Sequence, residues 1–266
     1  MFDQSRAWPG SGLRPPFGEQ RLAMVAVITA GGRVEGPLAG AIGSNVKALA
    51  RIAGRTLVDA AIEAALGAGA RRISVVGGEE IRRHCGARVD EIIGEDAKGR
   101  ENLRRAICSE TALPLLLLTS DMPFVDAAAL GAFAEAARDC DVALPLATEA
   151  AYDAAYPGAP PHVTAIGRER VANGNVVYFA PGIGERVLPV AQALFDARKS
   201  LLRMALLLGP ALLARYALGR LRIADVEARA AATLGVRARA IRDASPALCY
   251  DIDTWDDYQY AVARAS

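Results

Sequence analysis

The feature that most constrains the fold is a short apolar run that ends at two adjacent glycines. The run Met24–Ile28 stops at Thr29, Ala30, Gly31 and Gly32. An apolar run of this length, bounded by turn residues, is typical of a buried strand. Because glycine has no Cβ atom, the backbone N–H groups of such a turn can face an anion such as a phosphate. The feature therefore predicts a strand leading into an anion-binding turn, although glycine pairs also occur in ordinary turns.

Short apolar runs alternate with amphipathic stretches from this turn onward, as in a sheet whose strands are joined by helices. We therefore expect a doubly wound α/β fold. Four consecutive leucines, Leu115–Leu118, predict a central strand buried on both faces. The other expected strands are Ile73–Val76, Val89–Ile93, Val142–Leu144, Val163–Ile166, Val176–Ala180 and Leu248–Tyr250; the expected helices are one capped by Thr56, Glu79–Cys85, Asn102–Glu110, Val125–Arg138 and one capped by Asp253 or Thr254.

Two regions depart from this alternation. Residues 147–163 contain several prolines together with Tyr152 and Tyr156, which predicts a loop that could cover a site. The segment Val187–Leu234 has a helical pattern and predicts a helical C-terminal lobe. Its apolar part, Met204–Ala214, is too short for a bilayer, which needs about 20 residues, so we expect a buried helix there, with peripheral lipid contact as the alternative.

Length and composition fit a single domain. The chain has 266 residues, 52% of them hydrophobic, and we expect one domain over residues 23–266 after a disordered extension over residues 1–22. Its net charge of +1 provides no general field for holding nucleic acid. The 4 cysteines form no Cys-x-x-Cys pair, which argues against structural zinc and indicates free thiols in a reducing compartment. The first residues lack an apolar signal core, so we expect a cytoplasmic protein without a transmembrane segment.

Two residues are candidates for phosphate and metal chemistry. Lys47 follows a glycine-rich loop that begins at Gly31, and its ammonium group could neutralise a triphosphate held by that loop. Asp121 ends the leucine strand, where ligands bind in open α/β sheets, and a carboxylate there is well placed to hold Mg²⁺. The alternative for Lys47 is an ordinary surface lysine. The alternative for Asp121 is a helix cap, because Pro123 and a helical stretch follow it.

Further candidates lie in the second half of the chain. Asp251 and Asp253 follow an expected strand and alternate onto the same side, but capping of the last helix explains much of this acidic set without a metal. Asn175 belongs to an Asn-Gly-Asn sequence that could be a simple turn. Lys199 could bind an acceptor phosphate or lie on a helix surface. His162 is too isolated in the sequence to suggest a metal ligand.

The order of these motifs resembles a known family. The motifs are Ala30-Gly31-Gly32, Lys47-Ala48-Leu49, Thr119-Ser120-Asp121-Met122-Pro123-Phe124, and Asp251-Ile252-Asp253-Thr254 with Asp256-Asp257. Together they resemble the nucleotidyltransferases of the molybdenum-cofactor guanylyltransferase and sugar-phosphate cytidylyltransferase type, over about Ala23 to Ala261. The resemblance implies a GT-A-like, Rossmann-like doubly wound mixed sheet. It also implies an enzyme that uses Mg²⁺ and an NTP, CTP or GTP, to transfer an NMP to a phosphorylated small-molecule or lipid-related acceptor and releases pyrophosphate.

The resemblance also assigns roles to residues of this chain. The implied catalytic residues are Lys47 and Asp121; the nucleotide site is Ala30, Gly31, Gly32, Lys47, Gly77, Gly78 and Asn102; the metal ligands are Asp121, Asp253 and Asp251, with Asn175 as the alternative second ligand. The segment Val187–Leu234 would then be an acceptor lobe or the surface of a homodimer. No general base is required, because a phosphate monoester is already anionic near neutral pH.

Two departures from the family pattern leave the nucleotide base open. The usual Arg-Met-Gly after the glycine turn is replaced by a longer loop that starts at Arg33, and Val46 stands where a proline usually precedes the lysine. Two other classes of protein remain as alternatives. A nucleotide-sensing protein would keep the fold without turnover, and a Rossmann-type NAD(P)-dependent oxidoreductase would need a Gly-x-Gly-x-x-Gly spacing that this turn lacks.

Overall fold

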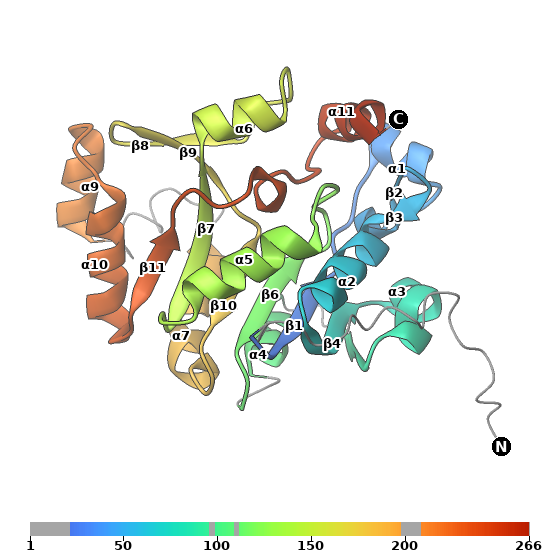
Figure 1. Cartoon of the computed structure of the whole chain (residues 1–266), viewed down its shortest axis with the longest axis horizontal. Helices are drawn as coiled ribbons and strands as arrows, with labels where there is room; N and C mark the ends of the chain where they lie inside the picture. Colours follow the sequence, from blue (N-terminus) through green and yellow to red (C-terminus); the bar gives the residue numbers. More distant parts are fainter. Residues whose placement is uncertain (1–21, 96–98, 109–111, 198–208, 266) are drawn as a thin grey trace.

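A mixed β-sheet runs through the molecule, and helices cover both of its faces (Figure 1). The computed structural model describes residues 22–95, 99–108, 112–197 and 209–265. The sheet has nine strands in the order β5-β4-β1-β6-β10-β7-β9-β8, with β11 paired to β7. The strands are β1 Met24–Thr29, β4 Ala70–Gly77, β5 Glu91–Gly94, β6 Leu115–Thr119, β7 Val142–Thr148, β8 Val163–Ile166, β9 Glu169–Asn173, β10 Val176–Phe179 and β11 Ala238–Ile241; a separate hairpin joins β2 Arg51–Ile52 to β3 Arg55–Thr56.

The helices alternate with these strands through the first half of the chain. They are α1 Gly36–Ile42, α2 Leu57–Gly67, α3 Glu79–Cys85, α4 Gly99–Ile107, α5 Ala127–Ala137, α6 Glu149–Ala155, α7 Gly184–Ala197, α9 Pro210–Ala217, α10 Ile223–Leu234 and α11 Trp255–Ala265. Short 3-10 helices lie at Lys47–Leu49, Gly86–Arg88 and Pro246–Leu248. The expected α/β fold and the helical C-terminal part are confirmed.

The strand directions place the candidate motifs at one edge of the sheet. β4, β1 and β6 are parallel, with Thr29 paired to Val76 on one side and to Thr119 on the other. The carboxyl ends of these strands therefore meet at the same edge, which is where ligands bind in open α/β sheets. β10 runs antiparallel to β6, so its amino end, which follows Asn175, also reaches this edge.

Alternate residues of the central strands pack on opposite faces, which fixes the strand register. Ala26 and Ile28 belong to the apolar core with α2 and α5, whereas Val25 and Val27 belong to the core with α4 and α7. Figure 1 shows α2 and α5 in front of the sheet and α4 and α7 behind it. Leu115, Leu116 and Leu118 are almost fully buried, which confirms the leucine run as a central strand.

Three local expectations were wrong. The loop expected over residues 147–163 contains α6, because Thr148 caps it by accepting a hydrogen bond from the Ala151 N–H, and an alanine-rich run continues it. The expected strand Leu248–Tyr250 begins instead inside a 3-10 helix, which Ser245 caps. The glycine-rich loop between Gly31 and Lys47 contains α1 and is less open than its composition suggested.

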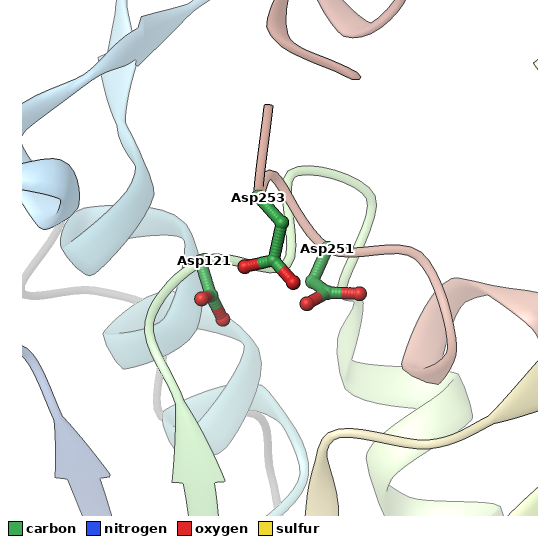
Figure 2. Close-up of side chains that lie close together, drawn as sticks. All are labelled: Asp121, Asp251 and Asp253. Carbon is green, nitrogen blue, oxygen red and sulfur yellow. The ribbon is translucent and has the colours of Figure 1, made fainter. Parts of the chain in front are cut away.

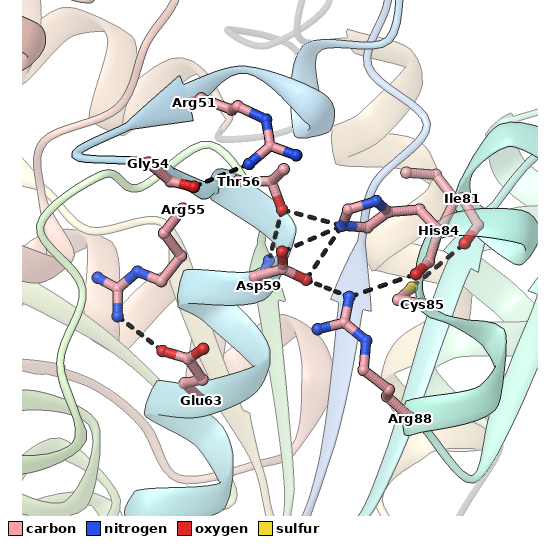
Figure 3. A network of polar contacts seen from close by, with 10 residues as sticks. All are labelled: Arg51, Gly54, Arg55, Thr56, Asp59, Glu63, Ile81, His84, Cys85 and Arg88. Atoms are coloured by element: carbon pink, nitrogen blue, oxygen red, sulfur yellow. Dashed lines mark hydrogen bonds and ion pairs between the residues drawn. The ribbon is translucent and has the colours of Figure 1, made fainter. Parts of the chain in front are cut away.

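A polar network fixes α2 to α3 on the outside of the sheet (Figure 3). Thr56 caps α2 as expected, accepting a hydrogen bond of 3.2 Å from the Asp59 N–H. His84 Nε2 lies 3.1 Å from the Asp59 carboxylate, which also forms an ion pair with Arg88. Burial raises the pKa of Asp59, but hydrogen bonds from Thr56, Arg88 and His84 outweigh burial and lower the pKa below its usual value. This network therefore stabilises the packing of the two helices when Asp59 is ionised.

The remaining expectations about composition concern the cysteines and the membrane. All of Cys85, Cys108, Cys140 and Cys249 are free thiols, as expected. Across the described parts of the chain, no helix combines the length and apolar character that crossing a membrane requires. Residues 204–208 of the apolar run Met204–Ala214 lie outside the described residues, so the expected burial of the run stays a prediction; in its described part, Leu212 is buried and Leu213 is exposed.

Candidate functional site

Three aspartates meet at the edge of the sheet where β1, β4 and β6 end (Figure 2). Asp121 comes from the turn after β6, and Asp251 and Asp253 come from the segment before α11. One carboxylate oxygen from each lies within 4.8 Å of the others. The Ile252 N–H donates a hydrogen bond of 3.0 Å to the Asp121 carbonyl, and this bond fixes the two segments side by side. Because Ile252 is fully buried, the aspartates on either side of it are directed toward the cluster.

The N-terminal cap of α11 fixes the backbone of Asp253 and Thr254, at the end of the segment that carries Asp251 and Asp253. The buried Asp257 carboxylate accepts hydrogen bonds from the N–H groups of Asp253 and Thr254, and Thr254 Oγ1 accepts one from the Asp257 N–H. This reciprocal pattern is a capping box, so Asp257 and Thr254 take the capping role that the sequence left open. The Asp253 side chain is 67% exposed and takes no part in this cap, so its carboxylate can contribute to the cluster.

Lys47 supplies a positive charge at the centre of this cluster. The backbone N–H of Lys47 donates a hydrogen bond to the Gly32 carbonyl. The side-chain Nζ of Lys47 lies 2.5 Å from Asp121 Oδ2 and 3.0 Å from Asp253 Oδ1. Burial of the ammonium group lowers the pKa of Lys47, but the charges of Asp121 and Asp253 and their hydrogen bonds outweigh burial and raise the pKa. Lys47 is therefore a firmly protonated counter-ion for two of the three aspartates.

The donor set fits a magnesium ion. Asp121 Oδ1 is buried and has no hydrogen-bond partner among the residues that the structure describes. A buried carboxylate oxygen without a partner is costly, and a bound cation would satisfy it. Carboxylate oxygens are the protein ligands that Mg²⁺ prefers, and Mg²⁺ usually needs one or two of them together with substrate phosphates. Asp121, Asp251 and Asp253 are therefore the residues that could hold it.

Two of the glycines expected to contact the nucleotide lie beside charged side chains. A Cβ atom added to Gly31 would lie 2.6 Å from Glu95 Oε1, and one added to Gly78 would lie 3.2 Å from the Arg33 guanidinium. Arg33 in turn forms an ion pair of 3.3 Å with Glu95. Gly31 and Gly78 therefore both lie beside the Glu95 side chain. Glu95 directly follows the glycine that ends β5, and no motif in the sequence predicted its position here.

Not every residue expected in the nucleotide site has the same surroundings. A Cβ atom on Gly77 would lie 2.8 Å from the Ile81 side chain, so this glycine allows α3 to pack against β4. Asn102 lies in the first turn of α4 and is half-buried; its contact with the nucleotide stays a prediction. The Asn175 carbonyl accepts from the Thr119 N–H, which places it near the end of β6. Lys199 lies outside the described residues.

A hollow of about 320 Å³ lies next to Asp253 and extends the site over α1. Its lining includes Arg33 from the glycine turn, Leu38 from α1 and Trp255 from α11. This is the segment in which the sequence departs from the family pattern.

His162 was also missed as a member of the site. It precedes β8, and its two ring nitrogens lie 3.3 Å from Asp251 and 3.0 Å from Asp257. The hydrogen bond to Asp251 raises the pKa of His162 against the opposing effect of burial, and Asp257 adds to the increase. The breaker-rich loop around Pro160 was a signal that this part of the chain approaches the site, but nothing in the sequence paired it with Asp251.

Comparisons with known proteins identify the fold and the family of the chain. The chain resembles the solved structure of a hypothetical transferase from Thermus thermophilus, with 27% identity, 90% of this chain and 100% of that chain covered, and a TM-score of 0.78. It shares its fold with the 2-C-methyl-D-erythritol 4-phosphate cytidylyltransferase from Thermus thermophilus (17% identity, 91% and 98% covered, TM-score 0.52). It also shares its fold with a nucleotidyl transferase from Methanothermobacter (17% identity, 92% and 98% covered, TM-score 0.54). None of the curated proteins compared gives a significant match.

The sequence model of the MobA-like NTP transferase domain matches residues 26–233, which is most of the chain. That range contains the glycine turn, Lys47 and Asp121, and the structure adds Asp251 and Asp253 to them. The chain therefore belongs to the MobA-like NTP transferase family and is a nucleotidyltransferase.

Proposed function

We propose that this enzyme transfers an NMP from an NTP to a phosphorylated small-molecule or lipid-related acceptor, with Mg²⁺ held by Asp121, Asp251 and Asp253. The observation that carries the proposal is the cluster itself. Three carboxylates and one ammonium group from distant parts of the chain meet beside a glycine turn, and one buried carboxylate oxygen lacks a partner among the described residues. A structural ion-pair network has no need of an unpaired buried oxygen, whereas a cation-binding site does.

The residues at this edge suit phosphoryl chemistry that relies on positioning and charge. Gly31 and Gly32 let the triphosphate approach the backbone closely, and their N–H groups can donate to it. Lys47 lies next to Gly32 and can turn its ammonium group toward the phosphates. Mg²⁺, when bound, neutralises charge on the reacting phosphates. The acceptor phosphate is already anionic, so no side chain has to remove a proton.

Asn175 stays the alternative second ligand. Its backbone carbonyl bonds to Thr119, close to Asp121 in the chain. We prefer Asp253 because Lys47 forms ion pairs with both Asp253 and Asp121, which shows that the two carboxylates lie close together.

We propose CTP or GTP as the nucleotide. The cytidylyltransferase among the similar structures supports CTP. Arg33, Glu80 and Glu95 are the charged groups beside Gly78, and Glu95 is also beside Gly31.

The direct test is pyrophosphate release. The protein is incubated with each of the four NTPs, Mg²⁺ and a panel of phosphorylated acceptors, and pyrophosphate is measured in a coupled assay. We expect release with one NTP and one acceptor class, and none when either is omitted. Tight NTP binding without pyrophosphate from any pair would instead identify a nucleotide-sensing protein and overturn the proposed reaction.

A further inference from the structure

We propose that His162 is a positioning residue of the metal centre, which holds Asp251 in the orientation that the cation needs and connects it to the cap of α11. This inference rests on the proposed function. It concerns a residue that lies outside the three carboxylates and in a different part of the chain, directly before β8.

The geometry of the imidazole ring is the first argument. His162 Nδ1 lies 3.3 Å from Asp251 Oδ1, and Nε2 lies 3.0 Å from Asp257 Oδ1. Each ring nitrogen faces a different carboxylate, so the imidazole spans the gap between Asp251 and Asp257. A side chain with polar contacts in two directions fixes the distance and angle between the two carboxylates. His162 therefore bridges Asp251 to Asp257 and cannot serve either one without holding the other.

The surroundings of the ring are the second argument. The His162 side chain is only 15% exposed, and its ring centroid lies 5.1 Å from that of Tyr250 and 6.0 Å from that of Tyr152. Tyr250 is itself fixed, because its hydroxyl donates a hydrogen bond of 2.9 Å to the Asp257 carbonyl. The imidazole therefore packs against two aromatic rings and has little freedom to leave the two carboxylates.

The contact with His162 restricts how the Asp251 carboxylate can face the metal centre. One oxygen of Asp251 is occupied by His162, and an oxygen of this carboxylate also lies within 4.8 Å of oxygens from Asp121 and Asp253. A side chain held in this way is prevented from rotating out of the cluster. Asp257 meanwhile fixes the Asp253 backbone through its N–H group. The His162 imidazole thus contacts Asp251 directly and is connected to Asp253 through Asp257.

Partners of this kind contribute to metal affinity in proteins generally. Removing a group that hydrogen-bonds to a metal ligand typically weakens metal binding by about 10- to 100-fold. The expected effect of losing the contact with Asp251 is therefore about 10-fold, at the low end, because the Asp251 side chain is already mostly buried.

Two substitutions separate the two contacts of the ring. In His162→Asn the side-chain amide replaces Nδ1, so it keeps a donor for Asp251 and loses the one for Asp257. In His162→Gln the longer side chain places its amide near the former Nε2, so it keeps the contact with Asp257 and loses the one with Asp251. His84→Gln is the matched control, because His84 also contacts an aspartate, Asp59, but lies on α3 outside the cluster.

Metal binding is measured without turnover, by titrating each full-length protein with Mn²⁺ and following the free ion by electron paramagnetic resonance. Melting temperatures without metal verify that the variants are folded. We expect Mn²⁺ to bind about 10-fold more weakly to His162→Gln than to the wild type, and the affinity of His162→Asn to stay within about 3-fold. His84→Gln should bind Mn²⁺ like the wild type.

The outcomes distinguish this inference from the proposed function. Wild-type affinity in a folded His162→Gln, or equal losses in both His162 variants, would overturn the positioning role and leave the proposed reaction intact. Failure of the wild type to bind Mn²⁺ would overturn the proposed metal centre, and this inference with it.

Discussion

Replacing Asp121 with asparagine tests the proposed metal centre most sharply. The amide has the shape of the carboxylate but no charge. Its oxygen would remain toward Lys47, whose Nζ lies 2.5 Å from Asp121 Oδ2, because two donors cannot face each other. The amide NH₂ would then take the place of the buried Oδ1 and present a donor to the cation. Losing the charge stabilisation that a metal gives to the transition state costs several kcal/mol, and a loss of about 4 kcal/mol lowers kcat about 10³-fold.

The fold should tolerate this change. Lys47 keeps its ion pair of 3.0 Å with Asp253, so we expect a loss of about 1 kcal/mol in the free energy of unfolding. In a chain of this length such a loss lowers the melting temperature by about 2 °C.

Asp126→Asn is the matched control. Asp126 lies in the same turn and caps α5 by accepting a hydrogen bond of 2.8 Å from the Ala129 N–H, and asparagine caps helices equally well. The assay is pyrophosphate release with the active NTP and acceptor, at several concentrations of Mg²⁺. A rate for Asp121→Asn within about 3-fold of the control would refute the metal role and the charge argument behind it.

Three further predictions concern other parts of the molecule. Lys47→Met should raise the KM for the NTP about 10-fold, because a charged hydrogen bond to phosphate is lost; an unchanged KM in steady-state assays would remove Lys47 from the site. Gly31→Ala should weaken NTP binding in isothermal titration, because the new methyl group collides with Glu95 at 2.6 Å; its melting temperature should change little, since the Glu95 side chain can move. Asp59→Asn should destabilise the protein above about pH 4 and cost less below it, because the lowered pKa of Asp59 gives stability that disappears as the pH falls through the folded pKa. Urea unfolding across pH measures this difference, and a difference that stays constant with pH would contradict it.

The strands and helices that could be predicted are those whose own residues determine them. Leu115–Leu118 is apolar on both faces and has one stable place, the middle of a sheet that is covered on both sides, which is where β6 lies. Thr56 carries its own capping signal for α2. The strand β9 and the helix α6 were missed, because prolines and glycines surround them and β9 pairs not only with the neighbouring β8 but also with β7, which precedes α6 in the chain. Pairing partners that are distant in the sequence leave no local pattern.

The candidate site shows the same limit. Lys47, Asp121 and Asp253 were found because each belongs to a motif with a known order, and the structure brings them into contact. Glu95 and His162 were not found, because nothing in the sequence pairs them with the other candidates; the breaker-rich loop around Pro160 indicated only that the chain near His162 approaches the site. The fold places Glu95 beside Gly31 and His162 beside Asp251.

The contact between Lys47 and Asp253 also has a consequence for how the protein folds. These residues are 206 positions apart, and Asp121 lies between them in the chain. Closing so long a loop costs entropy that the ion pair alone does not return, so most of the sheet has to form before the cluster can assemble. We expect refolding monitored by Mn²⁺ binding to lag behind refolding monitored by circular dichroism, and a protein trapped partway would have its secondary structure before it had a catalytic centre.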